Sequence, residues 1–310
     1  MINRAIFERT VSDFTKLRTV LIYLVALSVP LLIFANFASE APFFSVTSLD
    51  LRAEYIFGFF SVLSYIWVAG VAIALLSAVF CSSLIAGEVA DRTILLLVTK
   101  PVRRVEIFLS KFLAFIVAIV IYSAISLLVA IYIWASFFEL DVTSLSLFLS
   151  KAPLFFLYSL FVALFFGSLS AAISTISSSR LKAILPSILL IILAFFVFIQ
   201  VRGAARSLGS YRGLLSFLDV GYDFGNIYVT TLERGGVKFI PFMQTVIGTF
   251  TGVYDVPREG IKIDYDHGLI LPSLDRLYYR SPTESFLKLT VLPIVLTALG
   301  LLIFSRRDVS

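Results

Sequence analysis

The chain has 310 residues, of which 59% are hydrophobic and only 15% are charged. Soluble domains carry about 25% charged residues, so this composition excludes a water-soluble fold and requires the bilayer as solvent. The net charge of +5 does not indicate a nucleic-acid partner, because basic excess in a membrane chain marks its cytoplasmic loops. A single Cys and a single His exclude an intrachain disulfide and a Cys/His zinc site.

Six charge-free runs are each long enough to cross a bilayer, which takes roughly 17–25 residues. The runs show no alternation of apolar and polar residues, which excludes membrane strands. A further run, Phe239–Tyr254, is short and polar, so we expect a buried or interfacial piece there. We therefore predict an all-α polytopic membrane protein with six transmembrane helices. The six runs are Thr19–Ser39, Tyr55–Gly87, Phe112–Phe138, Ala152–Ser179, Ala183–Val201 and Leu289–Ser305.

The distribution of Lys and Arg predicts the orientation of these helices. Basic residues gather before the first run, between runs two and three, between runs four and five, and in the tail. The two short loops on the other side hold only Arg52 and Lys151. By the positive-inside rule, we expect a multi-pass protein of the cell membrane with both termini cytoplasmic.

Residues 1–18 precede the first predicted span and form an amphipathic pattern. Apolar and polar side chains separate on opposite arcs of a helical wheel, which predicts a helix lying in the membrane interface. We expect Phe7, Val11 and Phe14 to face the acyl boundary. Residues 19–200 then hold transmembrane helices one to five, and residues 286–310 hold the sixth helix and a cytoplasmic tail.

Residues 201–285 are predicted to form a small mixed external domain between helices five and six. Two short β-prone segments, Ile261–Tyr265 and Leu269–Leu271, flank Asp-His-Gly and indicate a hairpin. Nearby acids are either solvated hairpin charges or a cation site, and their spacing matches no standard calcium loop. These acids are Asp255, Glu259, Asp264 and Asp266.

The sequence offers no catalytic constellation. The six runs lack ionisable residues, which disfavours ion-coupled transport because that chemistry uses buried charges. The single histidine, His267, follows an acid in the predicted hairpin turn and has no nucleophile predicted beside it. There is no GxxxxGK[ST] phosphate loop, so the chain does not bind ATP through that motif. We expect a non-catalytic protein without a cofactor or metal of its own.

The loop at 87–111 carries the most specific pattern. The residue before Pro101 is driven out of the helical region, so the segment is predicted to be a helix, a break and a second helix. Its apolar stretch Ile94–Val98 is too short to span the bilayer. That stretch must therefore pack on the base of the bundle or into another protein. Arg103 and Arg104 follow at the start of the second helix.

The same loop resembles the type-2 ABC exporter permeases. The resemblance rests on Glu88, Thr93, Pro101, Arg104 and Lys111 within the pattern G-E-x-x-x-x-T followed by K-P-V-x-R. Many members carry Gly before the Thr, where this chain has Arg92. The resemblance implies that this loop contains a coupling helix that docks onto a separate ATPase subunit, which would hold ATP and Mg. It also implies a second cytoplasmic contact at residues 177–182.

The resemblance implies the membrane subunit of an ATP-driven transporter. Such a subunit would pair with an ABC ATPase and a second or homologous permease. Separately, the apolar, uncharged interior of the predicted spans favours export of a hydrophobic, lipid-like or peptide substrate. An ATPase-independent transporter or channel, and a scaffold presenting the external domain, remain alternatives. The residues predicted to couple to the ATPase are Glu88, Asp91, Arg92, Thr93, Leu96, Pro101, Arg103 and Arg104, with Arg180 and Lys182 at the second contact.

Overall fold

A computed structural model describes most of the chain. The described residues are 3–40, 49–91, 103–207, 211, 213–256, 262–264, 269–271 and 274–306.

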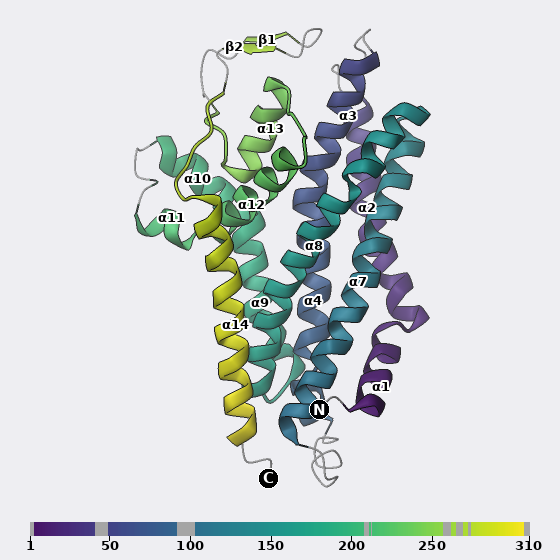
Figure 1. Cartoon of the computed structure of the whole chain (residues 1–310), viewed down its shortest axis with the longest axis vertical. Helices are drawn as coiled ribbons and strands as arrows, with labels where there is room; N and C mark the ends of the chain where they lie inside the picture. Colours follow the sequence, from purple (N-terminus) through teal and green to yellow (C-terminus); the bar gives the residue numbers. More distant parts are fainter. Residues whose placement is uncertain are drawn as a thin grey trace.

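Within these residues, six helices are long and apolar enough to cross a membrane. They run side by side along the long axis of the molecule, and both chain termini lie at one end (Figure 1). We call this end the termini end and the opposite end the distal end. The all-α polytopic fold is therefore confirmed. The six are α2 (Leu17–Ser39), the composite α3–η2–α4, α7 (Arg104–Phe137), α8 (Val142–Ile176), the composite α9–η3–α10, and α14 (Pro282–Arg306).

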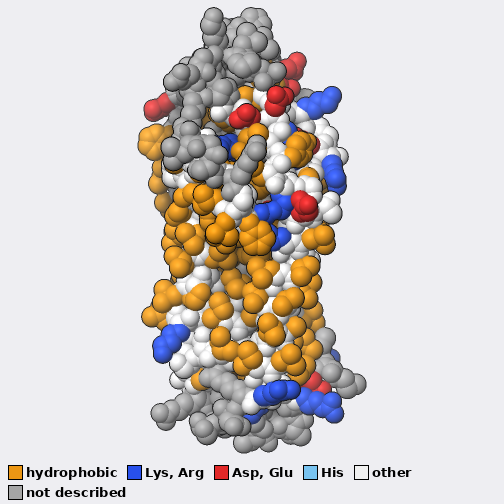
Figure 2. Space-filling model, turned by 90° about the vertical axis from the view of Figure 1, so that its left-hand side faces the viewer, with side chains coloured by type: hydrophobic (Ala, Val, Ile, Leu, Met, Phe, Trp, Pro, Cys, Tyr) orange, Lys and Arg blue, Asp and Glu red, His pale blue; other side chains and the backbone are white. Residues whose placement is uncertain are grey.

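The molecular surface has the zonation that a bilayer requires. On the face drawn in Figure 2, hydrophobic side chains form a broad band, whereas charged side chains gather toward the two ends. Along α2, exposed Leu21, Val25 and Ile33 alternate with buried Leu27 and Leu31. The helix therefore packs one stripe on the bundle and leaves the other for lipid, as expected for a peripheral span.

Two of the six spans contain π-helical turns near their middle. The second span consists of α3 (Leu49–Leu63), η2 (Ser64–Val71) and α4 (Ala72–Ser82). The fifth consists of α9 (Arg180–Ile192), η3 (Leu193–Val197) and α10 (Phe198–Ser207). The two π segments contact each other. Such wide turns are uncommon and concentrate at functional places in helices.

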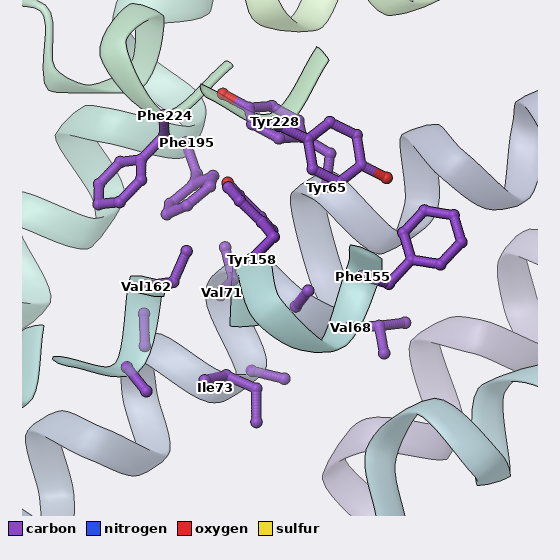
Figure 3. Close-up of a cluster of buried hydrophobic side chains, with 14 of the residues drawn as sticks. Tyr65, Val68, Val71, Ile73, Phe155, Tyr158, Val162, Phe195, Phe224 and Tyr228 are labelled. Carbon is purple, nitrogen blue, oxygen red and sulfur yellow. The ribbon is translucent and has the colours of Figure 1, made fainter. Parts of the chain in front are cut away.

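Aromatic side chains fill the space around these π segments. Tyr65, Tyr158 and Tyr228 come from three different elements and lie together with Phe195 and Phe224 (Figure 3). The Tyr158 and Tyr228 rings meet edge to face with centroids 4.6 Å apart. Edge-to-face pairs are favoured by the ring quadrupoles. The centre of the bundle is therefore a tightly packed aromatic core in which the hydroxyl of Tyr158 has no hydrogen-bond partner.

The helices extend further than the charge-free runs predict, because charged side chains inside them find hydrogen-bond or ion-pair partners. Lys151 lies within α8 and its Nζ donates to the backbone oxygen of Gly235 at 2.8 Å. Arg202 lies within α10, and its Nε is 2.9 Å from Asp219 Oδ2. Since the partner is distant in sequence, a run that ends at the first charge underestimates the helix.

The segment between spans five and six is a compact helical cap at the distal end (Figure 1). It contains α11 (Leu214–Leu218), α12 (Val220–Arg234) and α13 (Pro241–Thr251), followed by β1 (Lys262–Asp264) and β2 (Leu269–Leu271). The strands pair antiparallel with Ile263 opposite Ile270, which is the predicted hairpin. Helix α13 has 11 residues, too few to cross a bilayer. The side of the membrane on which this cap lies stays a prediction.

The N-terminal helix α1 (Arg4–Phe14) packs against α7 at the termini end. Asn3 caps it, since its Oδ1 accepts a hydrogen bond from Ile6 N at 3.2 Å. The expectation that Phe14 faces the acyl boundary is wrong. Its ring is buried and stacks on Phe80 with centroids 4.2 Å apart. Tyr122 Oη also donates to the Phe14 carbonyl oxygen at 2.9 Å.

Candidate coupling site

The described residues predicted for ATPase coupling all lie at the termini end. Glu88 belongs to the short helix α5 (Ala86–Ala90), and Asp91 is its C-cap. Arg103 and Arg104 begin α7, while Arg180 and Lys182 begin α9. Four further predicted residues lie outside the described part of the chain. These are Arg92, Thr93, Leu96 and Pro101.

A serine from a neighbouring span holds the bend between α4 and α5. Ser174 Oγ accepts hydrogen bonds from Ile85 N at 3.0 Å and Ala86 N at 2.9 Å. The same hydroxyl donates to the Ser82 carbonyl oxygen at 3.0 Å. These contacts satisfy backbone groups that a helix terminus leaves unpaired. Helix α5 is thereby fixed to α8.

A buried ion pair joins α5 to α7. Lys111 Nζ is 2.7 Å from Glu88 Oε1 and also donates to the Leu84 carbonyl oxygen at 2.8 Å. The Lys111 side chain is 7% exposed and that of Glu88 is 23% exposed. Breaking such a pair leaves an uncompensated buried charge, which is strongly destabilising. Glu88 therefore holds its segment against span three instead of extending into solvent.

A second ion pair joins the two predicted contact regions. Arg180 Nη2 donates to Asp91 Oδ2, although 88 residues separate the two in sequence. Both side chains are more than half exposed. Gly87 lets the guanidinium approach, because a Cβ at that position would lie 3.0 Å from Arg180 Nε. The loop after span two and the loop before span five therefore form one continuous surface.

The remaining predicted cations differ in their surroundings. Arg103 is exposed, whereas Arg104 is half-buried and its Nη1 donates to the Phe304 carbonyl oxygen at 3.2 Å. Since unpaired carbonyl groups end a helix, Arg104 satisfies the terminus of α14. Lys182 is exposed. Arg103 and Lys182 therefore extend outward, and Arg104 ties span three to span six.

The predicted site omits two residues that the structure places within it. Lys111 is part of the resemblance, but its role as the counter-ion of Glu88 depends on the packing of α5 on α7. In the sequence Lys111 directly precedes the third charge-free run, so the signal for a buried partner is a lysine at the edge of a span. Ser174 carries no comparable signal, because serines are frequent throughout α8.

A second charged cluster lies at the distal end, where α12 meets α14. The Asp223 carboxylate is fully buried and accepts two hydrogen bonds from Arg280 Nη1, at 2.6 and 2.8 Å. Lys288 Nζ and Ser285 Oγ donate to the same carboxylate at 2.5 and 2.9 Å. Burial raises the pKa of the Asp223 carboxyl, while the hydrogen bond and charge of Lys288 act against that rise. This cluster attaches the helical cap to span six.

No group of three or more His, Cys, Asp or Glu residues is placed to bind a metal ion within the described residues. Among the acids of the predicted hairpin, only the surroundings of Asp255 are described, and its backbone N donates to the Asp275 carbonyl oxygen at 2.8 Å. The side chains of Glu259, Asp264 and Asp266 lie outside the described part. Whether these acids are solvated charges or a cation site therefore stays a prediction.

Six apolar spans, with a charged surface that joins two of their connecting loops, describe a polytopic membrane protein. The chain belongs to the ABC-2 family transporter proteins, whose family model matches residues 5–309. It is therefore the membrane permease of an ABC transporter, a subunit type that is generally non-catalytic. Membership also implies partnership with an ABC ATPase subunit. A comparison with curated proteins finds no match.

Proposed function

We propose that this permease exports a hydrophobic, lipid-like or peptide substrate, and that a separate ATPase docks at the termini end. The main docking element is the loop at 87–111, with the second contact at the start of α9. The residues proposed to couple are Glu88, Asp91, Arg92, Thr93, Leu96, Pro101, Arg103 and Arg104, together with Arg180 and Lys182.

The observation that carries this proposal is the ion pair between Asp91 and Arg180. It unites the described ends of the two predicted contact regions into one surface. Behind that surface, Ser174 ties α5 to span four and Lys111 ties it to span three. A partner that moves α5 therefore moves several spans together. This is the connection that ATP-driven transport needs between a soluble motor and a membrane pathway.

The proposed assembly contains two permeases, either two copies or this chain with a homologue, and two ATPase subunits. ATP and Mg bind in the ATPase subunits. The termini end faces the cytoplasm, which the Lys and Arg distribution supports. The apolar aromatic interior around Tyr65 and Phe195 (Figure 3) supports a substrate with substantial apolar surface.

The proposal is tested by reversing the charge of Asp91. Its pair with Arg180 is exposed, so the pair contributes little to folding. In Asp91→Lys, the reversed charge no longer complements the facing surface of the ATPase, which lowers the affinity between the two subunits. We expect vanadate-sensitive ATP hydrolysis that co-purifies with the tagged permease to fall at least about tenfold. The matched control is Asp50→Lys, which reverses an exposed acid at the distal end.

A double exchange, Asp91→Arg with Arg180→Asp, restores the ion pair but not the original charge positions. Partial recovery of co-purifying hydrolysis would show that the pair itself shapes the docking surface. Full hydrolysis in both Asp91→Lys and Arg180→Glu would exclude this surface as the docking site. Transport that continues without any bound ATPase would favour the alternative of an ATPase-independent transporter.

A further inference from the structure

A large cavity lies at the termini end between the N-terminal helix and the bundle. Its volume is about 880 Å³, and its walls come from α1, the start of α2, α4, α5, α7 and α9. The wall residues are of two kinds, charged side chains and apolar side chains. A cavity with both kinds of wall fits an amphiphile, because the polar part of such a molecule contacts the charged side chains and the apolar part contacts the apolar ones.

The charged wall is not electrically balanced. Three of its cations are paired: Lys111 with Glu88 at 2.7 Å, Lys16 with Asp13 at 2.8 Å, and Arg180 with Asp91. Among the described residues that line the cavity, Arg9 is the cation left over, since no ion pair or hydrogen bond of its side chain is formed. The described lining therefore carries one excess positive charge.

Lys111 supplies a hydrogen-bond donor to the cavity in addition to this excess positive charge. The Leu84 carbonyl oxygen and Glu88 Oε1 accept two of the three protons of its ammonium. Within the described part of the chain, the third proton has no acceptor. Lys111 and Arg9 come from different helices and line the same cavity. Two like charges facing one space are stabilised by an anion between them, and a phosphate oxygen accepts from both groups.

The apolar wall is continuous with the lipid-facing surface. Val79 of span two is 49% exposed and Leu181 of span five is 67% exposed, and both line the cavity. Phe80 and Ile184 lie beside them in the wall. An acyl chain can therefore remain among the membrane-facing side chains of these spans while its headgroup enters the cavity. A soluble phosphate would leave this apolar wall unused.

We propose that the cavity binds the headgroup of an anionic phospholipid, with its phosphate between Arg9 and Lys111. The ligand comes from the leaflet at the termini end, and its acyl chains lie along the exposed side chains of α4 and α9. The amphipathic helix α1 closes the site on the other side. The cavity shares Glu88, Asp91 and Arg180 with the proposed docking surface. The proposal itself does not depend on docking, because the phosphate contacts Arg9 and Lys111 and the test uses the permease alone.

The test measures lipid-dependent thermal stability of the purified full-length permease in detergent micelles. Ligands that bind the native state raise the Tm by mass action. We expect dioleoyl phosphatidylglycerol to raise the Tm at lower concentrations than dioleoyl phosphatidylcholine. Removing the charge in Arg9→Gln should weaken the response to phosphatidylglycerol by about fivefold, the effect of one basic residue near anionic lipid. Inorganic phosphate, titrated in parallel, should have no comparable effect.

The matched control is Arg18→Gln. Arg18 is an exposed arginine near the same interface that does not line the cavity. Its variant should keep the wild-type response. Equal losses in Arg9→Gln and Arg18→Gln would overturn the proposal in favour of general surface attraction. A stabilisation by inorganic phosphate that matches phosphatidylglycerol would overturn the lipid source, and one by phosphatidylcholine would overturn the requirement for an anion. The lipid-free Tm of each variant reports whether it folds, and Arg9→Lys should restore the response.

Discussion

Asp223 illustrates how this chain keeps charges inside a largely apolar protein. Its carboxylate is fully buried, yet Arg280, Lys288 and Ser285 all donate to it. A buried ion pair contributes little net stability, but removal of one partner is costly because the other charge remains unpaired. The three donors stand on or just before span six, whereas Asp223 belongs to the helical cap. The cluster therefore attaches the cap to span six, alongside other contacts such as that of Lys151 with Gly235.

Replacing Asp223 by Asn is predicted to destabilise the protein by about 3 kcal/mol, because two half-buried cations lose their buried counter-ion. The matched control is Ser285→Ala, which removes one donor to the same carboxylate and should cost about 1 kcal/mol. Thermal unfolding of the purified proteins in one detergent measures both effects. If Asp223→Asn unfolds at the same temperature as Ser285→Ala, the ionised cluster is not what attaches the cap.

At the scale of single elements, α1 is attached to the bundle more firmly than an interfacial helix needs. Thr10 and Phe14 of α1 are buried, whereas Leu17, which begins α2 after a break at residues 15–16, is 73% exposed. The amphipathic pattern thus contains two apolar surfaces, one for the protein and one for lipid. Sequence periodicity groups both on one arc and does not distinguish them.

The stacking of Phe14 on Phe80 leads to a prediction for the whole helix. Phe14→Ala removes a buried ring and should cost about 3 kcal/mol of local packing energy. We expect faster amide hydrogen exchange across Arg4–Phe14, because local opening of α1 becomes easier. Phe7→Ala provides the control, since Phe7 is only half-buried on the same helix. Equal exchange rates in the two variants would contradict a specific anchoring role for Phe14.

The six spans were predictable because each contains a long apolar run, but their ends and contacts were not. Lys111, Lys151 and Arg202 each border a charge-free run, yet each lies inside a helix. Their ion-pair or hydrogen-bond partners are distant in sequence, and only the packed bundle brings them together. Asp91 and Arg180 are likewise distant in sequence and are brought together only by the packing of the bundle. Sequence reasoning named both residues, but it had no basis for joining them.

At the scale of the whole molecule, the orientation in the membrane can be tested with introduced cysteines. The native Cys81 is fully buried and should not react. Asp141→Cys, at the distal end, should react with an impermeant thiol reagent added to intact cells. Arg103→Cys and Arg180→Cys, at the termini end, should react only after the membrane is opened. Labelling of position 103 from outside would reverse the proposed orientation.

The π-helical turns in spans two and five have a consequence for relatives of this chain. An α-helix turns about 100° per residue, and each π turn takes up about one more residue than an α turn. A relative with a uniform α-helix at Leu193–Val197 would reach the same faces with one residue fewer. Alignments within the family should therefore place single-residue gaps there or within Ser64–Val71. A gap in the middle of a membrane span, normally taken as an alignment error, would here mark a change of helical phase.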